Sequence, residues 1–443
     1  MAKTRLAVIF GSRSVEHEVS VITAQQIMAA ADADRYEIVP VYITKQGEWL
    51  TGPALLDLDT FREPGRLERL ERAYLAPAPG QRALVRLDGG GLGLFRRGAG
   101  PEIDVVFPAV HGTHGEDGTL QGLLELADLP YVGAGVAAAA VGMDKLLMKA
   151  AFRAAGLPVV EARGYNRAEY QQTPDRVLDE LERAIGYPAF VKPAVLGSSI
   201  GVAQAGNRDD LRFALEVACS YGRRLLVERA VQPLTEVNCA VLGNDDPIPS
   251  VCEQPVPTEG VLSFADKYLR GGKAGPNPPA PLPMREGEGP AEAPPAPPGT
   301  EGGGPGLAPA APPFLNREGG PGGLGHKGSG QSSRLIPAPI SEALTARIQQ
   351  LAVAAFRAID CAGIARVDFL VSPNDERQVY VNEINTMPGS LSFYLWEPSG
   401  VPFPALIDRL VALALERHAD KQRTTYSYET DLLQRSSLGS KRG

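Results

Sequence analysis

Two short segments near the carboxyl end of the chain constrain its fold most. One holds Arg366 and Asp368 and the other holds Glu383 and Asn385, and in both segments the residues alternate as a β-strand requires. Side chains two residues apart leave a strand on the same face, about 6–7 Å apart. Glu383 and Asn385 therefore share a face, as do Arg366 and Asp368. Two neighbouring strands can thus present an arginine, two carboxylates and an amide to one pocket.

The oxygen atoms of this set predict a metal site. A carboxylate and an amide on one face, Glu383 and Asn385, form half of a hard-oxygen site that suits Mg²⁺. A Pro-Gly turn ending at Gly389 follows at once, and backbone N–H groups in such a turn can face a ligand. The set is suited to metal-bound phosphate beside an anionic substrate. The alternative is a solvated strand face, which the apolar neighbours disfavour because packed sheets exclude unpaired carboxylates.

The rest of the chain predicts an α/β protein. In the first third, strands and helices alternate, which indicates an open parallel sheet. The elements predicted there are strands at 6–10, 37–44 and 104–111, a helix at 19–31, and a hairpin from 83–87 and 93–96. The elements predicted later are helices at 144–155, 208–221, 341–360 and 403–417 and strands at 187–192, 224–228 and 236–243.

One segment breaks this pattern. Residues 274–330 contain no Val, Ile, Tyr or Trp, and about half of them are Pro or Gly. Such a segment cannot bury enough apolar surface to offset its ordering entropy, so we predict a disordered insertion inside a folded domain. Polyproline recognition by a partner is the alternative.

Composition excludes some functions and locations. The net charge is −8, which disfavours nucleic acid and anionic membranes as partners, although a local basic pocket can still bind an anionic substrate. The four cysteines have no metal-type pairing, and a reducing cytoplasm fits them. We expect no signal peptide, because the chain runs straight into a strand, and no apolar run reaches membrane-spanning length.

Two lysines accompany features that suit phosphate. Lys192 ends a predicted strand and precedes the Gly197–Gly201 loop, whose glycines and serines let backbone and hydroxyl donors approach phosphate oxygens. The alternative there is a plain turn. Lys145 follows Asp144, which we expect to be a helix N-cap or a first-turn residue, and can point at phosphates from the helix start. A solvated lysine is the alternative.

Three further segments are candidates for substrate binding. The loop at 111–118 holds two histidines and two acids, but we reject zinc because no second ligand cluster accompanies it; a nucleotide- or substrate-binding loop and a structural turn both remain open. Glu16 lies at the first strand–helix junction, where it would favour a cationic group or simply the helix dipole. Lys267 and Tyr268 belong to a lid or to an ordinary polar loop.

In order, these segments resemble the D-alanine–D-alanine ligases of the ATP-grasp superfamily. The matching segments are 16–20, 111–122, 143–145, 191–199, 266–269, 366–368 and 382–389. The resemblance implies an N-terminal Rossmann-like domain followed by two α+β subdomains that sandwich ATP. The implied boundaries are 1–133, 134–227 and 228–417, with a polar tail at 418–443.

The resemblance also implies a role for each candidate residue. A carboxylate of one D-alanine would attack ATP, and the amine of a second D-alanine would attack the resulting acyl phosphate. ATP would be bound by Lys145, Lys192, Gly197, Ser199, Glu228, Ala230, Val231, Glu236 and Lys267. Two Mg²⁺ or Mn²⁺ ions would be held by Asp368, Glu383 and Asn385. Arg366 and Gly389 would stabilise the oxyanion, and Glu16, Ser198 and Tyr268 would position the first D-alanine.

One departure from the family concerns the second substrate. In the family a serine a few residues beyond the Pro-Gly turn binds its carboxylate, but here the segment 390–396 is shorter, and neither Ser390 nor Ser392 has the matching spacing. The acceptor is therefore D-alanine, D-lactate, D-serine or another molecule. A silent nucleotide-binding homologue is a further alternative, against which the intact Lys145 and Lys192 argue. The resemblance also implies a cytoplasmic homodimer.

Overall fold

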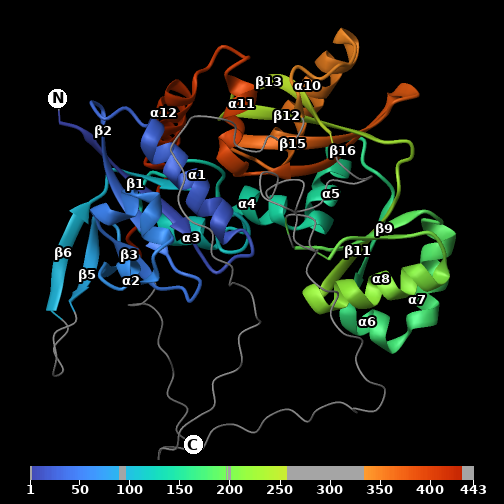
Figure 1. Cartoon of the computed structure of the whole chain (residues 1–443), viewed down its shortest axis with the longest axis horizontal. Helices are drawn as coiled ribbons and strands as arrows, with labels where there is room; N and C mark the ends of the chain where they lie inside the picture. Colours follow the sequence, from blue (N-terminus) through green and yellow to red (C-terminus); the bar gives the residue numbers. More distant parts are fainter. Residues whose placement is uncertain (1, 89–95, 196, 198–200, 257–333, 432–443) are drawn as a thin grey trace, which may run out of the picture.

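The structure, a computed structural model, describes residues 2–88, 96–195, 197, 201–256 and 334–431. Within these ranges the strands form three sheets, spanning residues 4–108, 162–229 and 235–385 in chain order. Figure 1 shows the first sheet and the third sheet side by side, with the second sheet set off below the third. The α/β class is confirmed. The domain boundaries at 133, 227 and 417 and the insertion at 274–330 stay predictions, and the insertion lies outside the described residues.

The first sheet is mixed, with the strand order β6-β5-β4-β3-β2-β1-β7. The predicted parallel arrangement holds for β2-β1-β7, whereas the remaining pairs are antiparallel. Parallel pairing needs a long crossover, and the short connections β2–β3, β4–β5 and β5–β6 permit only antiparallel return; β3 and β4 also pair antiparallel, although the longer segment 52–70 joins them. The strands are β1 (Thr4–Gly11), β2 (Tyr36–Ile43), β3 (Trp49–Thr51), β4 (Glu71–Tyr74), β5 (Ala83–Asp88), β6 (Arg96–Glu102) and β7 (Val105–Pro108). The predicted hairpin is present as β5 and β6, although residues 93–95 lie outside the described ranges.

Helices around the first sheet begin where its strands end. The regular ones are α1 (His17–Ala30), α2 (Pro64–Leu67) and α3 (Thr119–Leu126), and short 3₁₀ turns cover 53–56 and 58–61. Helix α1 starts directly after β1, so its first turn lies at the carboxyl edge of the parallel strands, where open α/β sheets bind ligands.

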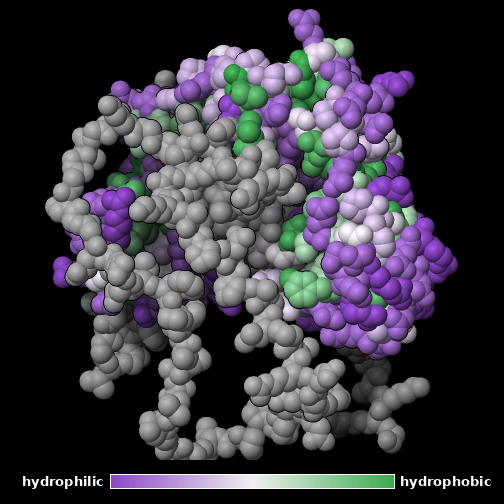
Figure 2. Space-filling model, turned by 45° about the vertical axis from the view of Figure 1, so that its right-hand side comes forward, coloured by the Kyte–Doolittle hydropathy of each residue, from purple (hydrophilic) through white to green (hydrophobic). Residues whose placement is uncertain are grey.

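The second sheet is antiparallel, with the order β10-β9-β11-β8. Its elements are β8 (Ala162–Asn166), α6 (Arg167–Gln172), α7 (Pro174–Ala184), β9 (Ala189–Pro193), β10 (Ala203–Ala205), α8 (Arg208–Tyr221) and β11 (Arg224–Arg229). The three helices cover one face of the sheet, and their outer surface, at the lower right of Figure 2, is largely hydrophilic. Helices α4 (Val136–Met143) and α5 (Lys145–Ala154) join this unit to the first, and α5 packs against β16 of the third sheet.

The third sheet is antiparallel as well, in the order β14-β13-β12-β15-β16. Its elements are β12 (Thr235–Gly243), β13 (Ile248–Pro255), β14 (Arg334–Leu335), α10 (Glu342–Ala358), β15 (Gly363–Ser372) and β16 (Asp375–Asn385). Helix α10 covers one face, where Ile348 and Phe356 pack with Val237, Val367 and Ile384. Because strand side chains alternate, the residues between these apolar ones face the opposite side of the sheet.

The last helix ties the third sheet to the first. A short turn at 389–392 and α11 (Phe393–Trp396) lead into α12 (Phe403–Lys421), which continues past the predicted end at Arg417. Leu406 and Leu410 of α12 share one hydrophobic core with Leu6 and Phe107 of the first sheet and Ile364 of the third. None of the described helices is long and apolar enough to cross a membrane.

Candidate active site

A row of polar side chains crosses the side of the third sheet that faces away from α10. The strand register places Glu253 opposite Asn238, Asn238 opposite Asp368, and Asp368 opposite Glu383. Directly opposed residues of antiparallel strands lie on the same face, so the four side chains line up across β13, β12, β15 and β16. The predicted placement of Asp368 and Glu383 on one face is confirmed. Sequence reasoning missed Asn238 and Glu253, because only the register across two further strands reveals them.

An arginine is fixed within this row. Arg366 donates to both oxygens of Asp368, with its Nε at 2.6 Å and an Nη at 2.7 Å, and the amide of Asn385 donates to the same carboxylate at 3.1 Å. Burial alone would lower the pKa of Arg366, but the paired Asp368 raises it well above its usual value. The guanidinium therefore stays charged and is held in one orientation, as a bidentate pair requires.

The oxygen donors of the row fit a hard divalent cation. Asp368 and Glu383 are directly opposed, and Asn385 is two residues beyond Glu383 on the same face. Mg²⁺ and Mn²⁺ accept such carboxylate and amide oxygens and complete their shell with phosphate oxygens and water. No three His, Cys, Asp or Glu side chains cluster in metal-binding geometry anywhere in the described ranges. An ion here would accordingly depend on the amide and on oxygens from a bound nucleotide.

Lysines gather on the side of the second sheet. The Asp144 carboxylate caps α5 by accepting from the N–H groups of Leu146 and Leu147, which confirms the predicted N-cap. Lys145 and Lys149 are four residues apart and so share a helix face. The Nζ of Lys145 lies 3.8 Å from Oε2 of Glu383, which directs the lysine at the metal-site row.

Glu228 lies between two lysines in the interior. Its Oε2 is 3.1 Å from Nζ of Lys149, and its Oε1 pairs with Lys192. Burial would raise the pKa of Glu228, but the two lysines outweigh it and lower that pKa to about 2. Burial also lowers the pKa of Lys149, which is 1% exposed. Lys149 was missed in the sequence, although its four-residue spacing from Lys145 was a usable signal.

The residues predicted to meet the base and ribose lie between the second and third sheets. Glu228 is near the end of β11, Ala230 and Val231 are in the connection to β12, and Glu236 is the second residue of β12. Ser198, Ser199, Lys267 and Tyr268 lie outside the described residues.

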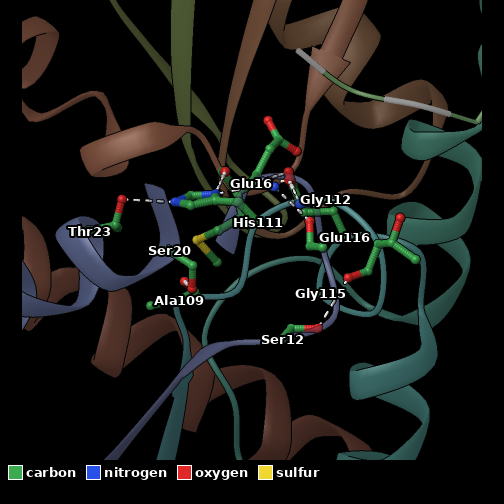
Figure 3. A network of polar contacts seen from close by, with 12 residues as sticks. Ser12, Glu16, Ser20, Thr23, Ala109, His111, Gly112, Gly115 and Glu116 are labelled. Carbon is green, nitrogen blue, oxygen red and sulfur yellow. Dashed lines mark hydrogen bonds and ion pairs between the residues drawn. The ribbon is translucent and has the colours of Figure 1, made fainter. Parts of the chain in front are cut away.

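Glu16 lies where two glycines come close. A Cβ atom placed on Gly112 would be 2.5 Å from Oε2 of Glu16, and one on Gly197 would be 3.0 Å from the same oxygen. The Glu16 carboxylate therefore reaches both the 111–118 loop and the start of the Gly197–Gly201 loop, as its predicted role requires. Glu116 accepts from the N–H groups of Gly112 at 2.8 Å and Met387 at 3.1 Å (Figure 3). Burial, and then the nearby Glu16, raise the pKa of Glu116 to about 8.

His111 joins the first sheet to the Pro-Gly turn. Its Nδ1 is 3.0 Å from the Met387 carbonyl oxygen and its Nε2 is 2.9 Å from the Thr23 hydroxyl (Figure 3). The ring is buried, and burial lowers the pKa of His111 to about 4. Both ring nitrogens thus have protein partners, which favours the structural interpretation of this part of the loop.

The turn itself has an unusual backbone. Ser390, Leu391 and Ser392 all have left-handed φ angles, of 51°, 53° and 48°. Each such non-glycine residue costs about 1 kcal/mol or more, so the surroundings must hold the turn in place. Ser392 is fully buried, and Tyr394, two residues further along, donates to Glu253 at 3.2 Å. The residues expected to contact the acceptor therefore adopt a conformation that local sequence rules did not predict.

Lysines on one side and a carboxylate–amide row on the other, carried by two antiparallel sheets, define an ATP-grasp fold. The family model described as "D-ala D-ala ligase N-terminus" matches residues 5–134, and "D-ala D-ala ligase C-terminus" matches residues 151–289 and 326–412. The chain belongs to the D-alanine–D-alanine ligase family.

Individual relatives agree over nearly the full length. The D-alanine–D-alanine ligase of Geobacillus kaustophilus is 35% identical, with 97% of this chain and 99% of the relative covered. That of Geobacillus thermodenitrificans is 36% identical, with 96% and 100% covered. Among solved structures, the D-alanine–D-alanine ligase of Coxiella burnetii has a TM-score of 0.68 at 30% identity, with 96% of this chain and 97% of that chain covered. The VanG D-Ala:D-Ser ligase of Enterococcus faecalis has a TM-score of 0.69 at 25% identity, with 93% and 100% covered.

Proposed function

We propose that this chain joins two D-alanine molecules into D-alanyl-D-alanine at the expense of ATP, which supplies a precursor of peptidoglycan. The observation that carries the proposal is the row that contains the Arg366–Asp368 pair, with Lys145 pointing at Glu383 from the opposite side. Positive charge thus surrounds the place where phosphoryl oxygens would lie, and a fixed guanidinium lies next to it. Such groups stabilise charge that develops in a transition state.

The first step activates a carboxylate. A carboxylate oxygen of the first D-alanine bonds to the γ-phosphorus of ATP, the bond to the β–γ bridging oxygen breaks, and ADP leaves. Lys145 and Lys192 offset the charge on the phosphoryl oxygens. We assign Gly197, Ser199 and Lys267 to the phosphates as well, Glu228, Ala230 and Val231 to the adenine, and Glu236 to the ribose. Lys192 pairs with Glu228 in the structure. In this proposal the Lys192 ammonium group interacts with both Glu228 and a phosphate oxygen once nucleotide is bound.

A divalent cation fits the row, and we assign Asp368, Glu383 and Asn385 to it. When bound, Mg²⁺ or Mn²⁺ would neutralise charge on the phosphate oxygens. Two ions per site are proposed. The Asp368 carboxylate is already oriented for this role, because Arg366 and Asn385 both donate hydrogen bonds to it.

The second step forms the amide. The amine of the second D-alanine attacks the carbonyl carbon of the acyl phosphate, phosphate leaves, and the nitrogen loses a proton. We propose that Arg366 and the Gly389 N–H bind the tetrahedral oxyanion. Glu16 would attract the α-ammonium of the first D-alanine and, with Ser198 and Tyr268, orient it. Glu16 is 6% exposed, which strengthens such an attraction because little water screens it.

A second candidate function concerns the acceptor. The left-handed turn at 390–392 replaces the family's longer segment, and the resemblance to a D-Ala:D-Ser ligase extends over 93% of this chain. A D-alanine–D-X ligase with D-serine, D-lactate or another acceptor is therefore the alternative. A silent nucleotide-binding homologue is the remaining one.

One assay separates these functions. The purified chain is given ATP, Mg²⁺ and D-alanine, and phosphate release is measured. Product masses are then recorded with equimolar D-alanine, D-serine and D-lactate. D-alanine-dependent phosphate and a D-Ala-D-Ala product support the proposal. A mixed product as the main species indicates the alternative ligase, and no D-alanine-dependent phosphate indicates the silent homologue.

We further propose a cytoplasmic homodimer. The supply of ATP in that compartment and the resemblance to the family support this proposal, and sedimentation of the purified chain tests the dimer.

A further inference from the structure

The turn that follows Gly389 is held from outside itself. Three successive left-handed residues without a glycine are unfavourable, so the turn persists only where other groups fix it. The groups that do so come from the first sheet and its helix, far away in the sequence. Thr23 on α1 and the 111–118 loop contact both sides of the Pro388–Gly389 bond.

The direction of each hydrogen bond in this contact can be deduced. A carbonyl oxygen only accepts, so Nδ1 of His111 carries the proton that it shares with Met387. In the neutral ring Nε2 then only accepts, and it accepts from the Thr23 hydroxyl at 2.9 Å (Figure 3). The Thr23 oxygen in turn accepts from the Ser390 N–H at 3.1 Å. One hydroxyl and one neutral imidazole therefore link the Ser390 amide to the Met387 carbonyl, and every group is satisfied.

The same contact determines where the Gly389 N–H points. The Leu391 N–H donates to the Pro388 carbonyl at 2.9 Å. That carbonyl and the Gly389 N–H belong to one planar peptide unit and point in opposite directions. This bond closes a turn over Pro388–Leu391 in which Ser390, the residue before Leu391, has its left-handed conformation. The peptide unit that carries the Gly389 N–H thus lies between two anchored points, Met387 on one side and the Ser390 amide on the other, and the Ser390 anchor restricts how that unit can rotate.

We propose that Thr23 is a positioning residue, whose hydroxyl aims the Gly389 N–H by fixing the Ser390 backbone. The inference rests on the proposed function, in which that N–H stabilises the oxyanion. Thr23 itself touches no substrate in this account. It acts through the turn, and His111 holds its hydroxyl in the required orientation.

The test compares Thr23→Val with Thr23→Ser. Valine keeps the shape of threonine but removes the hydroxyl, so the Ser390 N–H and Nε2 of His111 lose their shared partner. Losing an oxyanion donor outright costs about 100-fold or more in kcat, and a misdirected donor should cost about 10-fold. We expect this loss in kcat with the KM for ATP within about twofold of wild type, since the nucleotide residues lie elsewhere. Thr23→Ser should recover the kcat.

Ser20→Ala is the matched control. Ser20 lies on the same helix, is fully buried, accepts from the Gly11 N–H and donates to the Ala109 carbonyl (Figure 3), and neither of these hydrogen bonds involves the turn. It should lower the melting temperature without lowering kcat. If Thr23→Val fails to fold, Thr23→Cys replaces it in the test. A thiol donates and accepts hydrogen bonds more weakly than a hydroxyl, so the kcat of Thr23→Cys should be lower than that of Thr23→Ser.

Three results would overturn the inference: a wild-type kcat in Thr23→Val, an equal loss in Thr23→Ser, or an equal loss in Ser20→Ala. These results differ from failure of the proposed function. In that case the wild-type chain itself would release no phosphate in response to D-alanine.

Discussion

Two regions of the site, the nucleotide side around Glu228 and the side of the Pro-Gly turn, are built from different interactions. On the nucleotide side, Glu228, Lys149 and Lys192 form a buried cluster of full charges. On the side of the Pro-Gly turn, His111 and Thr23 make directional hydrogen bonds between neutral groups. Charges act over several ångströms and tolerate small shifts, whereas a hydrogen bond depends on angle as well as distance. The comparison suggests that the first side sets how tightly phosphate is held and the second sets where one N–H points.

The largest effect should come from the residue between the two sides. Arg366→Met removes the proposed oxyanion partner and leaves Asp368, which is 1% exposed, without its cation. We expect kcat to fall by about 100-fold or more. Arg366→Lys keeps the charge but loses the bidentate geometry, so it should recover only part of the rate. Phosphate release measures both, and full activity in Arg366→Met would remove this residue from the mechanism.

Breaking the charged side should affect stability and nucleotide affinity together. Lys149→Met removes one of the two lysines beside the buried Glu228, which should cost about 3 kcal/mol of unfolding free energy. Lys192 would then stay with Glu228, so the KM for ATP should rise. Urea unfolding and steady-state kinetics measure the two effects. The Lys149→Met, Glu228→Gln double variant should recover stability, and an unchanged ATP KM in the single variant would contradict the account.

Acid should lower the unfolding free energy through the buried His111 on the side of the Pro-Gly turn. The pKa of His111 falls from 6.5 to about 4 on folding. Between pH 6.5 and pH 4 the folded state therefore binds fewer protons than the unfolded state. Stability is therefore lost as the pH drops from 6.5 to 4, by up to about 3 kcal/mol. Glu116 acts in the opposite direction, because its pKa is raised to about 8 and its contribution is lost as the pH rises from 4.5 to 8.

Two variants separate these opposing contributions. His111→Gln should flatten the acid limb of unfolding free energy against pH, and Glu116→Gln should flatten the limb above pH 4.5. An unchanged acid limb in His111→Gln would show that this ring does not control it.

The smallest effect concerns the start of the helix that carries two of the lysines. Asp144→Ala removes the cap of α5 and should cost about 1 kcal/mol. Asp144→Asn keeps a capping oxygen and loses mainly the ion pair with Arg224, so it should cost less. Thermal unfolding measures the difference, and equal losses would mean that the ion pair rather than the cap matters.

What could be predicted from the sequence depended on how local each feature is. The shared face of Glu383 and Asn385, and that of Arg366 and Asp368, followed from alternation within single strands. Asn238 and Glu253 required the register of β12 and β13, which no local pattern fixes. The left-handed conformation at Ser390 and Leu391 contradicts local preference, because neither residue is a glycine. Thr23 gave no signal, since its role depends on a contact with a residue far along the chain.

The common core of the first sheet and α12 has a consequence for how the chain is made. Leu6 and Phe107 leave the ribosome long before Leu406 and Leu410, which share their hydrophobic core. Until α12 has been synthesised, a nascent chain therefore exposes this apolar surface, and chaperones that shield such surfaces can act on it. The hydrogen bond between Thr23 and Ser390 likewise forms only after the turn at 390–392 has been synthesised, so a growing polypeptide lacks the proposed positioning contact until then.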